Sequence, residues 1–364
     1  MEFPINMRLS NSITPLVEKR GTAYDLLMRM IDSELTSPHH GGDVSAAQAR
    51  FGAPAEGWID LSTGINPNPY PDTTTSQAVM ANLPTSAVLS DLLRAAHTNY
   101  GLAERAPLCA APGTQAILQI LPEIISVEGP VAVLSPTYSE HAHLWRHAGH
   151  RVMEIDELTQ IGDAKVVVVV NPNNPDGRCF DIAGLDAVRS NLADAQGLLI
   201  VDEAFADVTP GISMASLAGQ EGLIILRSFG KFFGLAGIRL GFAAGPTMLI
   251  DQLVKRLGPW AVSGPAIEIG TRALSDQAWI EKTRRSLIAA RQCLDDVLIS
   301  SGLEIIGGTD LFRLTQVEDA NTRYEQLGQA GILVRRFEEQ PGWLRFGLPG
   351  DAVAFERLSE ALAS

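Results

Sequence analysis

The sequence predicts an α/β protein built on a mostly parallel sheet, and three features predict that class. From about residue 107 onward, strand-like apolar runs alternate with segments of helical length. The run Val166–Val170 consists of five valines, which is typical of a strand buried on both faces of a parallel sheet. Several of these strands end in polar residues, at the edge where open α/β sheets bind their ligands.

Length, composition and charge limit the classes of protein. The chain has 364 residues, of which 46% are hydrophobic, so it is long enough for two domains or for one large α/β domain with an appendage. Its net charge of −14 has the wrong sign for binding a nucleic-acid backbone. No apolar run approaches the roughly 18 residues that span a bilayer, and the N-terminus lacks a signal peptide's apolar core. We therefore expect a cytoplasmic protein without a nucleic-acid or membrane partner.

The three cysteines predict neither a disulfide framework nor a zinc site, because their number is odd and no CxxC spacing occurs. No metal is expected.

The first 70 residues contain three candidate features. Residues 1–37 carry an amphipathic pattern that indicates one helix, either docked or part of a frayed tail. The turn HHGGD exposes backbone N–H groups at Gly41 and Gly42 beside His40, which suits an anion, although ordinary turn chemistry explains such a run as well. In WIDLSTGINPNPYP a short strand leads into an extended, proline-stiffened segment that can line a cleft, and Asn66 is its candidate substrate contact.

Two segments of the α/β region offer cofactor contacts. In LCAAPGTQAILQILPEII, the residues Gly113, Thr114 and Gln115 start an apolar-periodic helix, whose N-terminus either binds a phosphate or is a plain N-cap. The strand in VAVLSPTYSEH is followed by Tyr138, which either stacks on a planar ligand or fills the core.

Two further strands end in groups that suit a pyridine ring. The valine strand runs into NPNNPDG, where Asn174 can hold a ring hydroxyl. The strand LLIV ends at Asp202, which is either an N-cap or the partner of a protonated ring nitrogen.

The stretch SFGKFFGLAGIR carries the most specific chemistry. Aromatic and glycine neighbours are expected to desolvate Lys231, which lowers its pKa and makes a neutral amine available for an aldehyde. Ser228 and Arg239 supply a hydroxyl and a guanidinium suited to one phosphate. Pyridoxal 5′-phosphate needs both groups, whereas a glycine-rich loop with a solvated lysine is the alternative from these residues alone. The polar residues at the other strand ends favour the cofactor.

A family resemblance extends from about residue 39 to the C-terminus. The segments NPNNPDG, VDEAF and SFGKFFGLAGIRLGF resemble fold-type I pyridoxal-phosphate enzymes of the aspartate aminotransferase superfamily, in the branch of histidinol-phosphate aminotransferases and threonine-phosphate decarboxylases. HGGD and STGINPNPYP resemble the decarboxylase group in particular. The resemblance implies a homodimer, with a mostly parallel, seven-stranded sheet in a large domain and a small α+β domain. We expect an extension at 1–38, the large domain at 71–264, and the small domain at 39–70 and 265–364.

The resemblance also implies roles. Lys231 would form the Schiff base, Asp202 would pair with the ring nitrogen, Asn174 would meet the ring hydroxyl and Tyr138 would stack on the ring. The phosphate would be held by Thr114, Ser228 and Arg239, at the helix start that includes Gly113 and Gln115. Arg345, in WLRFGLP, would bind the substrate α-carboxylate, although a surface arginine on an edge strand is the alternative. For a substrate phosphate we expect the turn at His40, Gly41 and Gly42, assisted by Arg335 or Arg336.

These roles imply a small phosphorylated amino acid as substrate. The leading prediction is decarboxylation of L-threonine O-3-phosphate to (R)-1-aminopropan-2-ol O-phosphate in cobalamin biosynthesis. An aminotransferase, for example one acting on histidinol phosphate, is the alternative, and a catalytically silent regulator is a third. Two departures weaken the aminotransferase alternative. Phe205 stands where many aminotransferases have a tyrosine, and residues 83–85 read Leu-Pro-Thr where a tyrosine commonly crosses the dimer.

Overall fold

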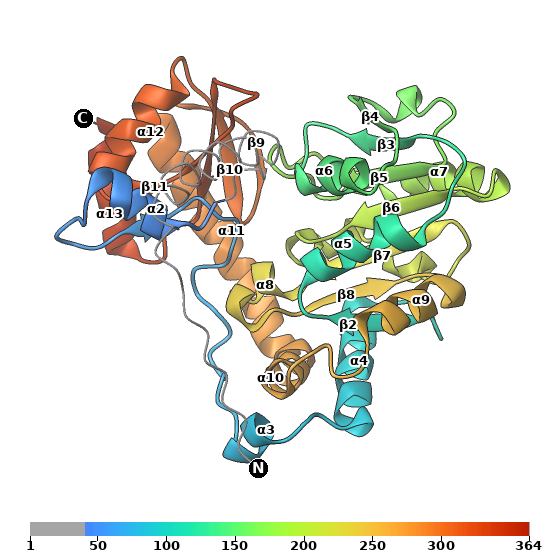
Figure 1. The fold of residues 1–364 in the computed structure, drawn as a ribbon. Helices are drawn as coiled ribbons and strands as arrows, with labels where there is room; N and C mark the ends of the chain where they lie inside the picture. Colours follow the sequence, from blue (N-terminus) through green and yellow to red (C-terminus); the bar gives the residue numbers. More distant parts are fainter. Residues whose placement is uncertain (1–40, 364) are drawn as a thin grey trace, which may run out of the picture. The chain divides into compact units, whose positions relative to one another are not determined.

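The largest sheet of the computed structural model, which describes residues 41–363, has seven strands (Figure 1). Its strand order is β2-β8-β7-β6-β5-β3-β4, and within this sheet β8 alone runs opposite to the other strands. The strands are β2 (Leu108–Ala111), β3 (Val131–Leu134), β4 (Val152–Ile155), β5 (Val166–Val170), β6 (Leu198–Asp202), β7 (Leu223–Ser228) and β8 (Gly241–Ala244). The predicted mostly parallel sheet is confirmed, and all five valines of β5 are buried.

Helices cover both faces of this sheet, and each face has its own apolar core. One core joins the sheet to α5 (Thr114–Ile124), α6 (Glu140–His147) and α9 (Thr247–Leu257). The other core joins it to α4 (Ser86–Tyr100), α7 (Ile182–Asp194) and α10 (Gly264–Ser275). Alternate residues of a strand therefore enter different cores, as Ile200 and Val201 of β6 do.

A second, antiparallel sheet is formed near the C-terminus. Its order is β12-β13-β10-β9, with β9 (Glu304–Thr309), β10 (Phe312–Gln316), β12 (Arg335–Arg336) and β13 (Trp343–Gly347). The short strands β1 (Ile59–Asp60) and β11 (Ile332–Leu333) pair in parallel beside it. The remaining elements are α2 (Val44–Phe51), α3 (Gln77–Ala81), α8 (Phe229–Phe232), α12 (Ala320–Gln329), α13 (Ala352–Ala363) and the 3₁₀ turns η1 (Leu158–Gln160), η2 (Ala206–Val208), η3 (Pro210–Ile212), η4 (Met214–Leu217) and η5 (Ala236–Ile238).

The sequence pattern also predicts one long helix over about 265–300, and this is wrong. The structure has two helices there, α10 and α11 (Gln277–Ser300), separated at Asp276. Asp276 leaves the helical conformation with ψ 76°, and its carboxylate accepts a hydrogen bond from the Trp279 N–H at 3.0 Å. An aspartate N-cap thus starts a new helix within an apolar pattern that continues across it.

Other expectations are untested. The amphipathic helix and the extension at 1–38 lie outside the described residues, and the boundaries of the large and small domains stay predictions. Within residues 41–363, no helix combines the length and the apolar character needed to cross a membrane.

Candidate active site

Three consecutive parallel strands deliver polar groups to one edge of the large sheet. Asn174 follows β5, Asp202 ends β6, and Ser228 ends β7 and leads directly into α8. Because β5, β6 and β7 are parallel neighbours, these carboxyl ends lie side by side. The structure thus brings Asn174, Asp202 and Ser228 to one edge, beside the helix that carries Lys231.

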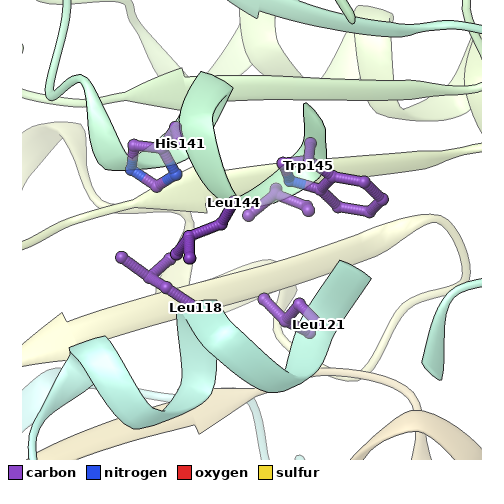
Figure 2. A pocket seen from close by; sticks show the side chains of 6 residues that line it. Leu118, Leu121, His141, Leu144 and Trp145 are labelled. Atoms are coloured by element: carbon purple, nitrogen blue, oxygen red, sulfur yellow. The ribbon is translucent and has the colours of Figure 1, made fainter. Parts of the chain in front are cut away.

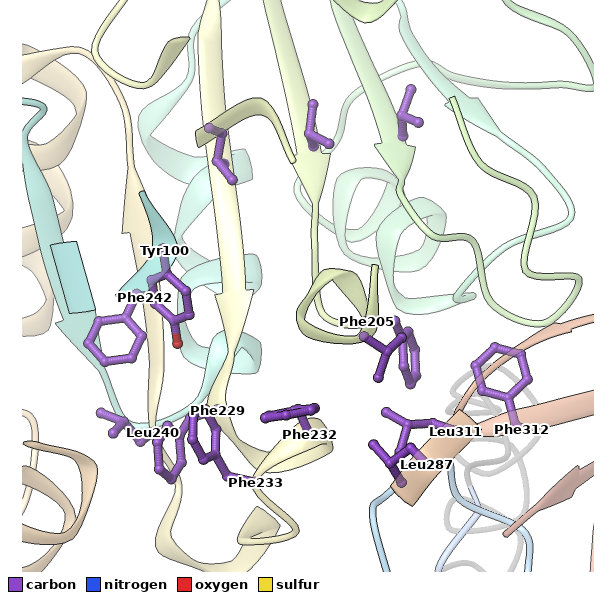
Figure 3. Packing of buried hydrophobic residues seen from close by; sticks show 14 of the residues in the cluster. Tyr100, Phe205, Phe229, Phe232, Phe233, Leu240, Phe242, Leu287, Leu311 and Phe312 are labelled. Carbon is purple, nitrogen blue, oxygen red and sulfur yellow. The ribbon is translucent and has the colours of Figure 1, made fainter. Parts of the chain in front are cut away.

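Aromatic packing holds α8 in place (Figure 3). Phe229 and Phe233 stack with ring centroids 4.3 Å apart, and Phe233 stacks on Trp279 at 5.7 Å. The rings of Phe229 and Phe233 are fully buried, whereas Trp279 and Lys231 are half-buried, so the phenylalanines anchor the helix and leave the lysine to face the site.

Burial, followed by the nearby charge of Arg345, lowers the pKa of Lys231 to about 8, while Asp202 opposes the shift. The amine nitrogen lies 5.7 Å from the ring centroid of Phe205, which has no hydroxyl to solvate it. This lowered pKa agrees with the desolvation of Lys231 that its aromatic and glycine neighbours predict. A lysine with this pKa has a useful neutral fraction near neutral pH.

The lowered pKa predicts how the apoprotein captures pyridoxal phosphate. Only the neutral amine attacks an aldehyde, so the capture rate should rise about tenfold per pH unit below pH 8 and level off above it. Stopped-flow absorbance would measure the rate, and N-acetyl-lysine in parallel would correct for the titration of the aldehyde itself. A rate that keeps rising past pH 10 would show an ordinary lysine and contradict the prediction.

Asp202 has a partner that the sequence did not reveal. Its Oδ2 lies 3.0 Å from Nε2 of His141 in α6, and both side chains are buried. Oδ1 accepts the Ala204 N–H at 3.0 Å. His141 therefore fixes the orientation of the carboxylate at the end of β6. The sequence offered no signal beyond its position three residues after Tyr138.

His141 is also part of the wall of a small apolar pocket (Figure 2). Its other walls are Leu118, Leu121, Leu144, Trp145 and Ile200. These apolar neighbours shield the contact between His141 and Asp202 from water, which strengthens it.

An anion cradle lies where α5, β7 and β8 meet. The α5 N-cap is Gly113, which has a φ of 85° and no side chain to cap the first turn. A Cβ at Gly113 would lie 2.5 Å from Nη2 of Arg239, so the guanidinium packs directly over the start of the helix. Ser228 at the end of β7 pairs with Gly241, where a Cβ would come within 2.5 Å of the Thr114 nitrogen. The structure therefore unites Gly113, Thr114, Ser228 and Arg239 around one helix N-terminus.

Tyr138 belongs to a chain of hydrogen bonds with Gln115 and Glu140. Its hydroxyl donates to Oε1 of Gln115 at 3.3 Å, and Nε2 of Gln115 donates to Oε2 of Glu140 at 2.8 Å. Burial, with help from Glu140 and Asp202, raises the pKa of Tyr138, so its phenol stays neutral. Gln115 thus orients the Tyr138 ring.

Arg345 is a buried cation beside the lysine. Its Nη1 donates to Oδ1 of Asn174, and Nη2 donates to the Ser62 carbonyl at 2.8 Å. Burial, followed by the repulsion from Arg335, lowers the pKa of Arg345 to about 9. Its Nε–H has no acceptor among the described residues. A buried guanidinium with an unused donor is suited to a carboxylate ligand. The contact of Asn174 with a ring hydroxyl stays a prediction.

The structure separates Arg335 from Arg336. Arg335 pairs directly with Arg345 across β12 and β13, so both side chains lie on the same face of the small sheet. Arg336 lies on the other face, where Nη1 donates to Oδ1 of Asn321 at 2.8 Å. Arg335, rather than Arg336, is therefore the arginine beside the site.

Gly41 and Gly42 lie against the residue that holds Arg345. The Gly42 N–H donates to Oγ of Ser62 at 2.7 Å, and a Cβ at Gly41 would lie 2.4 Å from the Ser62 carbonyl oxygen. Any larger residue at position 41 would displace the acceptor of Arg345. His40 lies outside the described residues.

Asn66 supports α8. It is buried, its Nδ2 donates to the Phe232 carbonyl at 2.9 Å, and its backbone N–H donates to the Lys231 carbonyl at the same distance. The residue thus links the extended segment to the lysine-bearing helix, and a substrate contact for it stays a prediction.

Residues 59–362 match the family described as aminotransferase class I and II. The chain belongs to this family. It resembles a threonine-phosphate decarboxylase of Pseudomonas aeruginosa, with 45% identity over 89% of this chain and 96% of the relative. A protein of the same name from a Sinorhizobium species is 43% identical over 89% of this chain and 97% of the relative.

A solved structure supports the fold of this aminotransferase-family chain. It is a histidinol-phosphate aminotransferase from Sinorhizobium meliloti in complex with pyridoxal 5′-phosphate. The TM-score is 0.76 at 19% identity, with 90% of this chain and 95% of that chain covered. The predicted fold-type I architecture is confirmed.

The site of this family member fits pyridoxal 5′-phosphate by its chemistry. The Lys231 amine suits the aldehyde, the cradle at Gly113 and Arg239 suits the phosphate, and buried Asp202 suits a protonated ring nitrogen.

Proposed function

We propose that this chain is a pyridoxal-phosphate-dependent threonine-phosphate decarboxylase, which converts L-threonine O-3-phosphate to (R)-1-aminopropan-2-ol O-phosphate in cobalamin biosynthesis. The observation that carries the proposal is the pair of arginines on one face of the small sheet, Arg345 and Arg335. One guanidinium suits the carboxylate and the other suits the phosphate of the same small substrate. The two relatives that share 43–45% identity and carry this name support it.

Asp202, Arg345 and Lys231 have separate roles in this reaction. When bound, the cofactor supplies an electron sink for the bonds of the substrate Cα. Asp202, oriented by His141, keeps a proton on the ring nitrogen. Arg345 sets the direction of the substrate carboxylate, which decides whether the bond to carbon or the bond to hydrogen is aligned for cleavage. Lys231, with a pKa of about 8, can hold the proton that Cα receives after CO2 departs.

The test of this function needs no second substrate. Purified protein loaded with pyridoxal phosphate is mixed with L-threonine O-3-phosphate in the absence of any keto acid, and CO2 and aminopropanol phosphate are followed. Multiple turnovers are expected. If no CO2 appears, and amino transfer occurs only when 2-oxoglutarate and a donor such as histidinol phosphate are supplied, the chain is an aminotransferase and the proposed reaction is wrong.

We further propose that Arg335 binds the substrate phosphate. Loss of a hydrogen bond to a charged group costs about 1.5–3 kcal/mol, so Arg335→Ala should raise KM for L-threonine O-3-phosphate roughly 10- to 150-fold, with a smaller change in kcat. Arg336→Ala is the matched control, because that side chain lies on the opposite face with Asn321. Equal KM values for the two variants would remove the assignment.

A cytoplasmic homodimer completes the proposal. The homodimer is supported by exposed apolar side chains at the end of α3 and in the loop before α4, where Met80 is 67% and Leu83 is 64% exposed. Light scattering should give twice the chain mass of 39.0 kDa, and Leu83→Asp should shift the mass toward the monomer. A monomeric wild-type protein at micromolar concentration would contradict the dimer.

A further inference from the structure

The ends of β6 and β7 present different residues to the two faces of the sheet. Ile200 and Leu226 enter the core under α5 and α6, and Asp202 and Ser228, two residues further on, point to that same face. Glu203, which directly follows β6, and Arg227, the residue before Ser228 in β7, continue the opposite face after Val201 and Ile225. The residues next to Asp202 and Ser228 in the sequence therefore lie on the opposite face of the sheet, which we call the rear side of the candidate cofactor site.

Charged groups fill this rear side. Arg227 donates from Nη1 to Oε2 of Glu203 at 2.8 Å and from Nη2 to Oδ1 of Asp207 at 2.7 Å. Glu203 also accepts from the Ser213 hydroxyl at 2.5 Å and from the Met214 N–H at 2.6 Å. Glu203, Asp207 and Arg227 are at most 4% exposed. We call these three residues the rear clamp.

The rear clamp also reaches the helix that carries the lysine. Arg284 of α11 donates from Nε to the Asp207 carbonyl at 2.7 Å, and its guanidinium lies 5.7 Å from the ring centroid of Phe232. Phe232 is adjacent to Lys231 in α8. The clamp is therefore connected to the strand ends of Asp202 and Ser228 and to the lysine-bearing helix.

Stability alone does not account for such a cluster. Removing charges from water is costly, and well-packed apolar residues in place of a buried ion pair often leave stability unchanged or raise it. What the cluster supplies is geometry, because a guanidinium that grips two carboxylates permits only a narrow range of positions for their backbones.

We propose that the rear clamp is a positioning device for the cofactor: it fixes the spacing between Asp202 and Ser228. The inference rests on the proposed function, since it requires that these two residues hold the ring nitrogen and the phosphate of one rigid molecule. A rigid ligand bound at both ends loses affinity when its anchors separate by a fraction of an ångström.

The test uses the full chain and three variants. Arg227→Lys and Glu203→Gln loosen the rear clamp, and the triple variant Glu203→Leu, Asp207→Leu, Arg227→Met removes its charges. The readouts are the dissociation constant of pyridoxal phosphate, the visible circular dichroism of the bound cofactor, and Tm. The matched control is Arg291→Lys. It loosens the contacts of Arg291 with Asp295 in α11 and with Asp310, which lies between β9 and β10 and not at the edge of the large sheet that carries Asp202 and Ser228.

We expect each clamp variant to raise the cofactor dissociation constant about tenfold or more and to change the dichroism. The triple variant should do so at a Tm close to that of the wild type, whereas Arg291→Lys should lower Tm without changing cofactor affinity. Clamp variants that lower Tm but keep wild-type cofactor affinity and dichroism would overturn the inference. Failure of the wild-type protein to bind pyridoxal phosphate would instead overturn the proposed function.

Discussion

The Lys231→Ala protein should lose at least about three orders of magnitude in kcat, because it lacks both the amine that attaches the cofactor and the group that carries a proton at Cα. Its fold should survive. The lysine side chain is half-buried and Asp202 already pairs with His141, so the deletion leaves no buried charge without a partner. Turnover of L-threonine O-3-phosphate and thermal unfolding would be measured on the same preparation.

Lys255→Ala is the control for this experiment. Lys255 is exposed on α9, so the same chemical change there should leave kcat within a factor of about two. A Lys231→Ala protein with a normal Tm and more than a tenth of wild-type activity would mean that another group performs the chemistry.

Substitution of Arg345 by lysine should lower kcat/KM for L-threonine O-3-phosphate by roughly 30- to 5,000-fold. Truncating one partner of a buried, hydrogen-bonded charge pair costs about 2–5 kcal/mol, and an ammonium cannot reproduce the planar fork that meets a carboxylate. The variant should also lose the hydrogen bonds to Asn174 and to the Ser62 carbonyl, so the substitution should disturb the positions of these two residues as well.

Arg313→Lys is the matched control on the same sheet. Arg313 is the residue before Leu314, which pairs with Arg345, so its side chain lies on the opposite face, and its Nε lies 2.7 Å from Oδ1 of Asp295. This variant should keep substrate affinity. If Arg345→Lys had the same kinetic constants as Arg313→Lys, the carboxylate would have to be bound elsewhere. Product analysis would add a second readout, because a misdirected carboxylate should increase amino transfer relative to CO2 release.

Short sequence patterns were sufficient to predict the strands of the large sheet and the site residues at the ends of those strands. Five valines in succession require a doubly buried strand, and the turn residues after each strand fix where it ends. Aromatic and glycine neighbours predict a desolvated Lys231, which agrees with a pKa of about 8. The break at Asp276 was also readable, because aspartate is a preferred N-cap residue, but the apolar period continued across it and concealed it.

Local sequence patterns were enough to predict the strands, their polar ends and the lysine, because these depend on neighbours within about ten residues. The contact of His141 with Asp202, 61 residues away, and the shared face of Arg335 and Arg345 became known from the three-dimensional structure. It also revealed the rear clamp, which joins the ends of two strands with the loop between them. Short sequence patterns do not encode these contacts. A strand gives its residues two opposite faces, and which face meets which partner is fixed by register and packing between distant segments.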